Sequence, residues 1–214
     1  MSADVNCAPV ITDLADAQDR MNARLDEVIP KRYRAAAVEH PAIAEWVEEY
    51  VECPSEARSL LVMGPVGSGK TWAAYGALRA AAVRSLKPNR AGRYVLGTWT
   101  STTFPDFVAH LRPRAYSERD DMTSEKYMLT LRETPLLLLD DLGVGKATEW
   151  TEEVTHRLVS GRYDDEKPSI YTTNLTPAEL NVIVGERMVS RLAEQCVRVQ
   201  LLGVDRRRVK KQEA

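Results

Sequence analysis

Short apolar runs alternate along the chain with stretches in which apolar residues recur every three or four positions. The runs predict strands over residues 59–63, 94–99, 136–139, 169–174 and 197–201. The helical spacing predicts helices over residues 12–28, 41–52, 72–83, 104–111, 127–131 and 148–160, and two more that begin near residues 177 and 185. Residues 115–123 have the composition of a polar loop. Strands separated by helices predict an α/β domain with a parallel sheet.

The first predicted helix, residues 12–28, is amphipathic and carries a narrow apolar stripe. Leu14, Met21, Leu25 and Val28 fall at heptad-like spacing between charged residues. Such a stripe either packs on its own domain, which is the commoner case, or is offered to a partner helix.

A glycine-rich loop between the strand at 59–63 and the helix at 72–83 is the strongest chemical signal. It fits the pattern G-x-x-x-x-G-K-[ST] in full, with backbone N–H groups that can cradle phosphates. Lys70 is predicted to reach the β- and γ-phosphates of ATP, and the Thr71 hydroxyl to ligate Mg²⁺. Trp72 follows directly, and the pattern gives no reason for it. The loop consists of Gly64, Pro65, Val66, Gly67, Ser68, Gly69, Lys70 and Thr71.

The apolar run at 136–139 ends in two aspartates. A run without polar alternation is typical of a parallel strand buried on both faces, whose acidic end emerges at the carboxyl edge of the sheet. Asp140 is therefore predicted to hold Mg²⁺, and Asp141 to polarise the attacking water.

Three further side chains are candidates for the same chemistry. Asn174 follows the strand at 169–173 and has an amide suited to orienting a water, although an Asx turn explains it equally well. On the last predicted helix, Met188, Leu192 and Ala193 mark the core side, whereas Arg187 and Arg191 lie one turn apart on the other side. The arginines are either solvated or offered to the ATP of a neighbouring subunit.

Composition excludes several other classes of protein. The 214 residues carry a net charge of −2, which excludes a globally basic nucleic-acid binder. Three cysteines and three histidines are scattered and indicate neither a disulfide framework nor a zinc site. Because no apolar run approaches the length of a membrane span and residues 1–9 do not resemble a signal peptide, a cytoplasmic protein is expected.

Taken together, GPVGSGKT, LLLLDDLG, YTTNLTPAEL and GERMVSRL resemble the ATPase core of the DnaC/DnaI helicase-loader and IstB transposition-helper group of AAA+ proteins. The resemblance implies a three-layer α-β-α P-loop NTPase with a five-stranded parallel sheet and without a C-terminal lid domain. It implies a catalytic Walker B pair in Asp140 and Asp141, sensor 1 in Asn174, and a trans-acting arginine finger in Arg191, accompanied by Arg187. The expected organisation is a helical extension over residues 1–29, an ATPase domain over 30–205 and a basic tail over 206–214.

The function implied by this resemblance is an ATPase that loads or remodels a replicative helicase on single-stranded DNA, as an ATP-dependent homo-oligomer. Arg112, Arg114 and Arg119 are candidate DNA contacts, although a solvated loop explains them as well. One alternative is an IstB-like helper that presents DNA to a transposase. A small-molecule P-loop kinase and a non-hydrolysing ATP-dependent binding module are alternatives of other classes.

Overall fold

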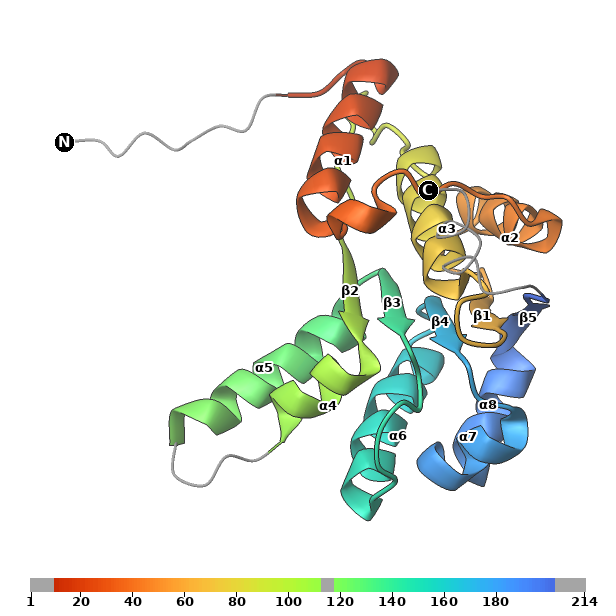
Figure 1. Cartoon of the computed structure of the whole chain (residues 1–214). Coiled ribbons are helices and arrows are strands. Elements are labelled where there is room, and N and C mark those ends of the chain that lie inside the picture. The colour runs from red at the N-terminus through yellow and green to blue at the C-terminus, as the bar shows by residue number, and fades with distance from the viewer. Residues whose placement is uncertain (1–9, 113–117, 203–214) are drawn as a thin grey trace.

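A five-stranded parallel sheet forms the centre of the molecule. The computed structural model describes residues 10–112 and 118–202, with residues 118–122 described by their backbone alone (Figure 1). The strand order is β2-β3-β4-β1-β5, and every paired neighbour is parallel, as predicted. The strands are β1 Ser59–Met63, β2 Trp99–Thr103, β3 Leu136–Asp140, β4 Ser169–Thr173 and β5 Cys196–Gln200.

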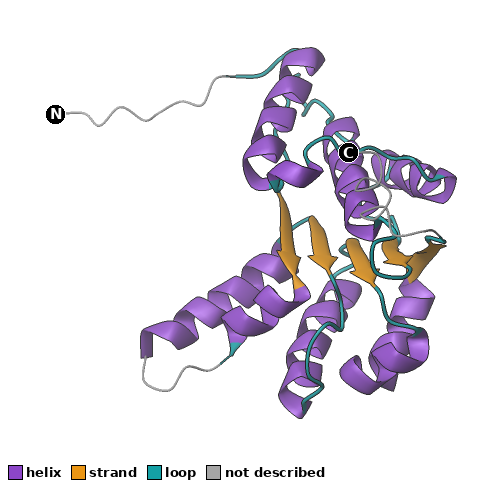
Figure 2. Ribbon diagram, viewed as in Figure 1, coloured by secondary structure: helices purple, strands orange, loops and turns teal. Residues whose placement is uncertain are grey.

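Helices cover both faces of the sheet and create two separate apolar cores (Figure 2). Side chains alternate along each strand, so Leu60 and Val62 enter one core while Leu61 enters the other. The first core lies under α1 Leu14–Val28, α2 Pro41–Glu52 and α3 Lys70–Arg84. The second lies under α4 Phe104–Leu111, α5 Glu118–Glu133, α6 Glu149–Asp164, α7 Pro177–Val184 and α8 Glu186–Gln195.

Helix α1 packs on its own domain, which is the commoner of the two cases considered above. Its buried residues are Ala17, Met21 and Leu25, whereas Leu14 and Val28 are exposed, so the predicted stripe was wrong at both ends. Arg79 of α3 donates to Asn22 Oδ1 at 2.9 Å and also pairs with Asp26. The helix is therefore attached to α3 by polar bonds in addition to apolar contacts.

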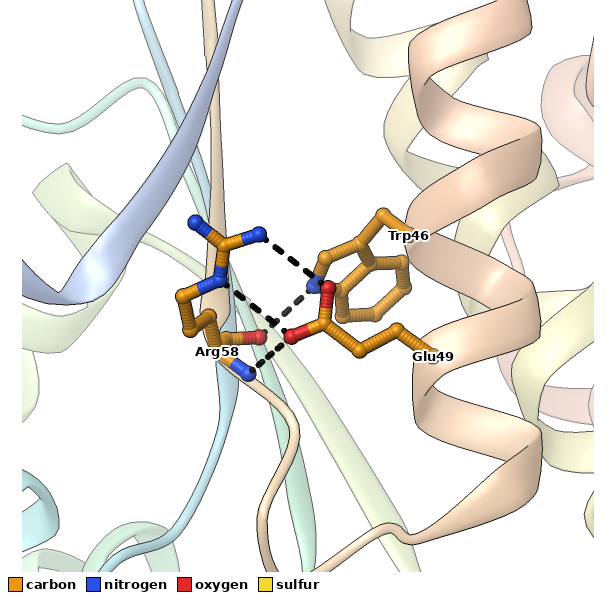
Figure 3. Close-up of polar contacts among 3 residues, drawn as sticks. All are labelled: Trp46, Glu49 and Arg58. Atoms are coloured by element: carbon orange, nitrogen blue, oxygen red, sulfur yellow. Dashed lines mark hydrogen bonds and ion pairs between the residues drawn. The ribbon is translucent and has the colours of Figure 1, made fainter.

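Helix α2 is joined to the start of β1 by a small polar cluster (Figure 3). The Trp46 indole N–H donates to the Arg58 carbonyl oxygen at 2.7 Å. The Glu49 carboxylate accepts from the Arg58 backbone N–H at 3.2 Å and from its guanidinium at 3.2 and 3.3 Å. These bonds satisfy backbone groups at the point where the chain enters the sheet.

Two predicted segments differ from the structure. The second strand is formed by residues 99–103 and not by 94–99, because Tyr94 makes only isolated antiparallel bridges and Val95 is 68% exposed. Strand β2 lies at the edge of the sheet and is half-buried throughout, so it can be built mainly of threonines. The prediction relied on apolar residues and therefore missed it. Helix α5 begins at Glu118, so residues 118–123 of the predicted polar loop are helical.

The helix starts follow the sequence signals closely. Thr103 accepts from the Asp106 backbone N–H and caps α4, and Thr176 forms a complete capping box with Glu179 at the start of α7.

No helix within the described ranges combines the length and apolar character needed to cross a membrane.

Arg162 joins three segments beneath the sheet. It is 1% exposed and donates to the carbonyl oxygens of Leu131, Arg132, Thr134 and Pro168 and to Ser169 Oγ, at 2.6 to 3.1 Å. Burial lowers its pKa to about 10, which still leaves the guanidinium charged at neutral pH. The end of α5 and the start of β4 therefore share one buried cation from α6.

Replacing this residue should lower stability sharply. Arg162→Met leaves several buried carbonyl groups without a donor, and we expect a loss of about 3 kcal/mol in the free energy of unfolding, measured by urea denaturation. Arg157→Met on the same helix removes only an exposed pair with Glu125 and should cost about 0.5 kcal/mol. Equal losses in the two variants would contradict this account of Arg162.

Candidate nucleotide site

The phosphate loop joins β1 to α3 in a conformation that depends on glycine. Gly67 and Gly69 have φ values of 85° and 94°, in the left-handed region that other residues rarely adopt. A Cβ atom at Gly64 would lie 2.5 Å from the Leu201 carbonyl oxygen, so this position also excludes a side chain on contact grounds. Gly69 provides no side-chain cap to α3, which leaves the first N–H groups of the helix available to an anion.

Lys70 and Ser68 turn towards the interior of this loop. Lys70 is 6% exposed, and its Nζ donates to the Pro65 carbonyl oxygen at 2.9 Å. The Ser68 hydroxyl is buried and has no hydrogen-bond partner among the described residues. A buried hydroxyl without a partner and a glycine cradle fit the oxygen atoms of a phosphate group.

Asp140 ends β3 beside the phosphate loop. The Thr71 hydroxyl lies 3.1 Å from both of its carboxylate oxygens, and the Thr172 hydroxyl donates to Oδ1 at 2.5 Å. Asp140 is 6% exposed, and burial raises its pKa, an effect that the bond from Thr172 opposes. The paired oxygens of Thr71 and Asp140 are hard ligands of the kind that Mg²⁺ prefers.

Asp141 is held in an unusual backbone conformation by the neighbouring strand. Its φ is 58°, and its backbone N–H donates to Thr172 Oγ1 at 2.9 Å. The next residue, Leu142, donates its N–H to the Thr172 carbonyl oxygen and accepts a bond from the Thr173 hydroxyl. The two threonines of β4 therefore fix the turn that carries Asp141.

Asn174 leaves the end of β4 half-buried. In the turn that follows, the Leu175 backbone N–H donates to Thr173 Oγ1 at 3.2 Å, and the Asn174 side chain is not the acceptor. The structure thus assigns the turn-forming role, which was an alternative for Asn174, to its neighbour.

These elements line a cavity of about 690 Å³ at the carboxyl edge of the sheet. It brings the phosphate loop together with the predicted acidic and amide side chains. The lining residues are Arg32, Tyr33, Glu39, Val66, Gly67, Gly69, Lys70, Thr71, Trp72, Asp140, Asp141, Val144 and Asn174. Over the described ranges, no group of three or more histidine, cysteine or acidic residues is placed to hold a metal ion.

One wall of the cavity was not predicted from the sequence. Arg32 and Tyr33 lie in the short 3-10 helix η1 Lys31–Tyr33, with the guanidinium 4.9 Å from the Tyr33 ring centroid. Tyr33 stacks on Tyr75 of α3, and Trp72 bonds to Glu39. No pattern in the sequence links residues 30–33 to the phosphate loop, which begins about 30 residues later.

Arg187 and Arg191 do not line this cavity. Arg187 is exposed, whereas Arg191 is half-buried with its guanidinium 5.5 Å from the Tyr163 ring centroid. Its Nη1 is buried and has no hydrogen-bond partner in the described part of the chain, so Arg191 is not the fully solvated side chain that was one of the two alternatives. Ala193, expected on the core side of α8, is exposed. This arrangement gives no support to a phosphate clamp within one subunit.

The candidate DNA contacts are only partly described. Arg112 is exposed at the end of α4, and Arg119 lies in the first turn of α5. Arg114 and the basic tail over residues 206–214 lie outside the described residues.

Comparison with known proteins identifies the same group that the motifs resemble. The family model described as "IstB-like ATP binding protein" matches residues 42–214. The replicative helicase loader DnaI of Bacillus subtilis (strain 168) is 26% identical over 165 residues, which are 76% of this chain and 47% of DnaI. The chain therefore spans about half the length of this curated relative.

Two solved structures share the fold. The crystal structure of the DnaC helicase loader has a TM-score of 0.62 and 23% identity, covering 81% of this chain and 100% of that one. The crystal structure of DnaI has a TM-score of 0.64 and 16% identity, and the match covers 86% of this chain and 99% of the DnaI chain. The predicted three-layer P-loop NTPase fold with a five-stranded parallel sheet is thus confirmed.

Neutralising the buried carboxylate should stabilise the nucleotide-free protein. Burial raises the pKa of Asp140 in the folded protein, so the ionised carboxylate lowers the free energy of unfolding when the pH is above that pKa. This destabilisation is lost as the pH falls and the carboxylate becomes protonated. We expect Asp140→Asn to raise Tm near neutral pH in EDTA, with a gain that narrows towards about pH 4, the range of a free aspartate. Thermal scans across pH measure the effect, and a Tm below that of the wild type at neutral pH would contradict it.

Proposed function

We propose that this chain, which belongs to the family of IstB-like ATP-binding proteins, hydrolyses ATP in order to load or remodel a replicative helicase on single-stranded DNA. The observation that carries the proposal is the convergence of five side chains from three strand ends on one cavity. These are Lys70, Thr71, Asp140, Asp141 and Asn174.

The lining residues support a division of roles in hydrolysis. Lys70 and the N–H groups of the loop would bind the β- and γ-phosphates. Thr71 and Asp140 would hold Mg²⁺, which neutralises charge on the phosphates. Asp141 would accept the proton of the attacking water, and Asn174 would orient that water.

We further propose that the site is completed by a second copy of the chain. Arg187 and Arg191 lie outside the cavity of their own subunit, on helix α8. In an ATP-dependent open or spiral oligomer, Arg191 of a neighbouring subunit would enter the site and stabilise charge in the transition state, with Arg187 accompanying it.

Mixing two inactive variants tests this arrangement. Lys70→Ala and Arg191→Ala should each lose at least about 10³-fold in ATP turnover, because each removes a cation from the transferring phosphates. An equal mixture should recover about a quarter of wild-type activity, since a quarter of randomly formed interfaces join an intact Lys70 to an intact Arg191. Phosphate release measures the recovery.

Arg191→Lys, which keeps a cation beside Tyr163, controls for the loss of that local contact. A mixture no more active than its components would contradict the role of Arg191 across an interface.

Resemblance in sequence and fold supports the choice of client. DnaI of Bacillus subtilis, whose match covers 76% of this chain, is named a replicative helicase loader. The description of the matching family favours a second candidate, an IstB-like helper that acts with a transposase. In either case, Arg112, Arg114 and Arg119 are the proposed contacts to the DNA backbone.

Retention of the helicase on single-stranded DNA separates the two clients. With ATP, the wild-type chain should increase retention of the host's replicative helicase on immobilised DNA about tenfold, and the triple variant R112A/R114A/R119A should abolish this gain. The difference between the wild type and the variant should be largest at low salt and shrink as salt rises, because each phosphate contact adds to the salt dependence of binding. Retention of a transposase and not of the helicase would instead favour the IstB-like role.

A further inference from the structure

Trp72, which no motif explains, forms part of the cavity wall and is bonded to a segment far from it in sequence. Its indole N–H donates to Glu39 Oε1 at 3.2 Å. Glu39 lies between η1 and α2, whereas Trp72 lies in the first turn of α3, directly after the phosphate loop. The indole is half-buried and packs against the apolar core beneath α1, α2 and α3. One hydrogen bond therefore connects the start of α3 to the segment that leads into α2.

The same segment follows the surface of α3 through two more contacts. Tyr33 stacks on Tyr75, with ring centroids 5.1 Å apart and an interplanar angle of 18°. A Cβ atom at Gly76 would lie 2.5 Å from the Ala37 carbonyl oxygen, so the missing side chain permits this close approach. Trp72, Tyr75 and Gly76 lie on one side of the helix, three and four positions apart. Residues 33–39 thus contact α3 at three successive points along the helix, at Tyr75, Gly76 and Trp72.

The chemistry of this wall differs from that of the phosphate loop. Arg32 and Trp72 bring planar groups of the kind that stack on a nucleobase to this wall, and the Tyr33 ring, stacked on Tyr75, lies beneath the Arg32 guanidinium. The Glu39 carboxylate repels phosphate, and it accepts a charge-assisted bond from the Trp72 indole. This wall is therefore suited to a base and not to a triphosphate.

We propose that Trp72 and Glu39 form a latch that positions the nucleobase wall of the cavity. The latch holds residues 32–39 against α3, so that Arg32 and Tyr33 are in place when the nucleotide enters. Trp72 and Glu39 act as positioning residues and take no part in hydrolysis. The inference rests on the proposed function only in taking a nucleotide as the ligand.

Comparing two ligands, MgATP and magnesium tripolyphosphate, tests the latch by calorimetry on the full chain. Trp72→Ala and Glu39→Ala should each raise the Kd for ATP about fivefold, as expected for the loss of one ordering hydrogen bond. Both should bind tripolyphosphate within about twofold of wild type, because the phosphate loop is unchanged. This second affinity also shows that the variants are folded.

Two control variants complete the design. Glu39→Gln removes the charge but keeps an acceptor oxygen, and it should raise the Kd for ATP less than Glu39→Ala does, because the hydrogen bond is weakened and not lost. Glu45→Ala removes an exposed carboxylate from α2 outside the cavity and should have no effect. Wild-type affinity for ATP in both W72A and E39A, or an equal loss of tripolyphosphate binding, would overturn the latch. A wild-type chain that binds neither ligand would overturn the proposed ATPase itself.

Discussion

The carboxylate of Asp140 is buried at the carboxyl edge of the sheet, and its neighbours are arranged to keep it there. Thr71 from α3 and Thr172 from β4 both direct hydroxyl groups to it, so the helix after the phosphate loop and the adjacent strand meet at one charge. Thr172 also holds the backbone of Asp141. A buried carboxylate is costly unless it accepts hydrogen bonds. The need to supply those bonds constrains how α3, β3 and β4 lie relative to one another beside the cavity.

The parts that the sequence predicted well are those in which a local pattern has one physical meaning. The glycines of the loop, the apolar run before Asp140 and the capping box at Thr176 each specify a backbone geometry without reference to distant residues. The edge strand β2 was misplaced because its half-buried threonines carry no such pattern. The bonds of Arg162 join residues about 30 positions apart, and single-sequence periodicity contains no information on them.

The candidate site shows the same division. Most of the predicted phosphate loop lines the cavity together with the acidic and amide residues, because parallel strands place their carboxyl ends at one edge. The aromatic wall was missed because Tyr33 and Glu39 reach α3 only through the tertiary fold. Arg191 was predicted to lie on the side of α8 opposite its apolar residues, but helical spacing could not reveal the ring of Tyr163 beside it. Patterns along the chain thus identify groups that the fold gathers, but not the partners that each group meets.

The pair of helices α4 and α5 projects from one edge of the sheet (Figure 1). At the sheet end it is held by the carbonyl bonds of Arg162 and by a 3.0 Å bond from the Tyr127 hydroxyl to Thr102 Oγ1. The core residues Phe104, Phe107 and Leu131 are buried in the part nearest the strands. The attachment of this helix pair therefore lies where the chain leaves β2 and returns to β3, so a substitution at that end reaches the sheet directly.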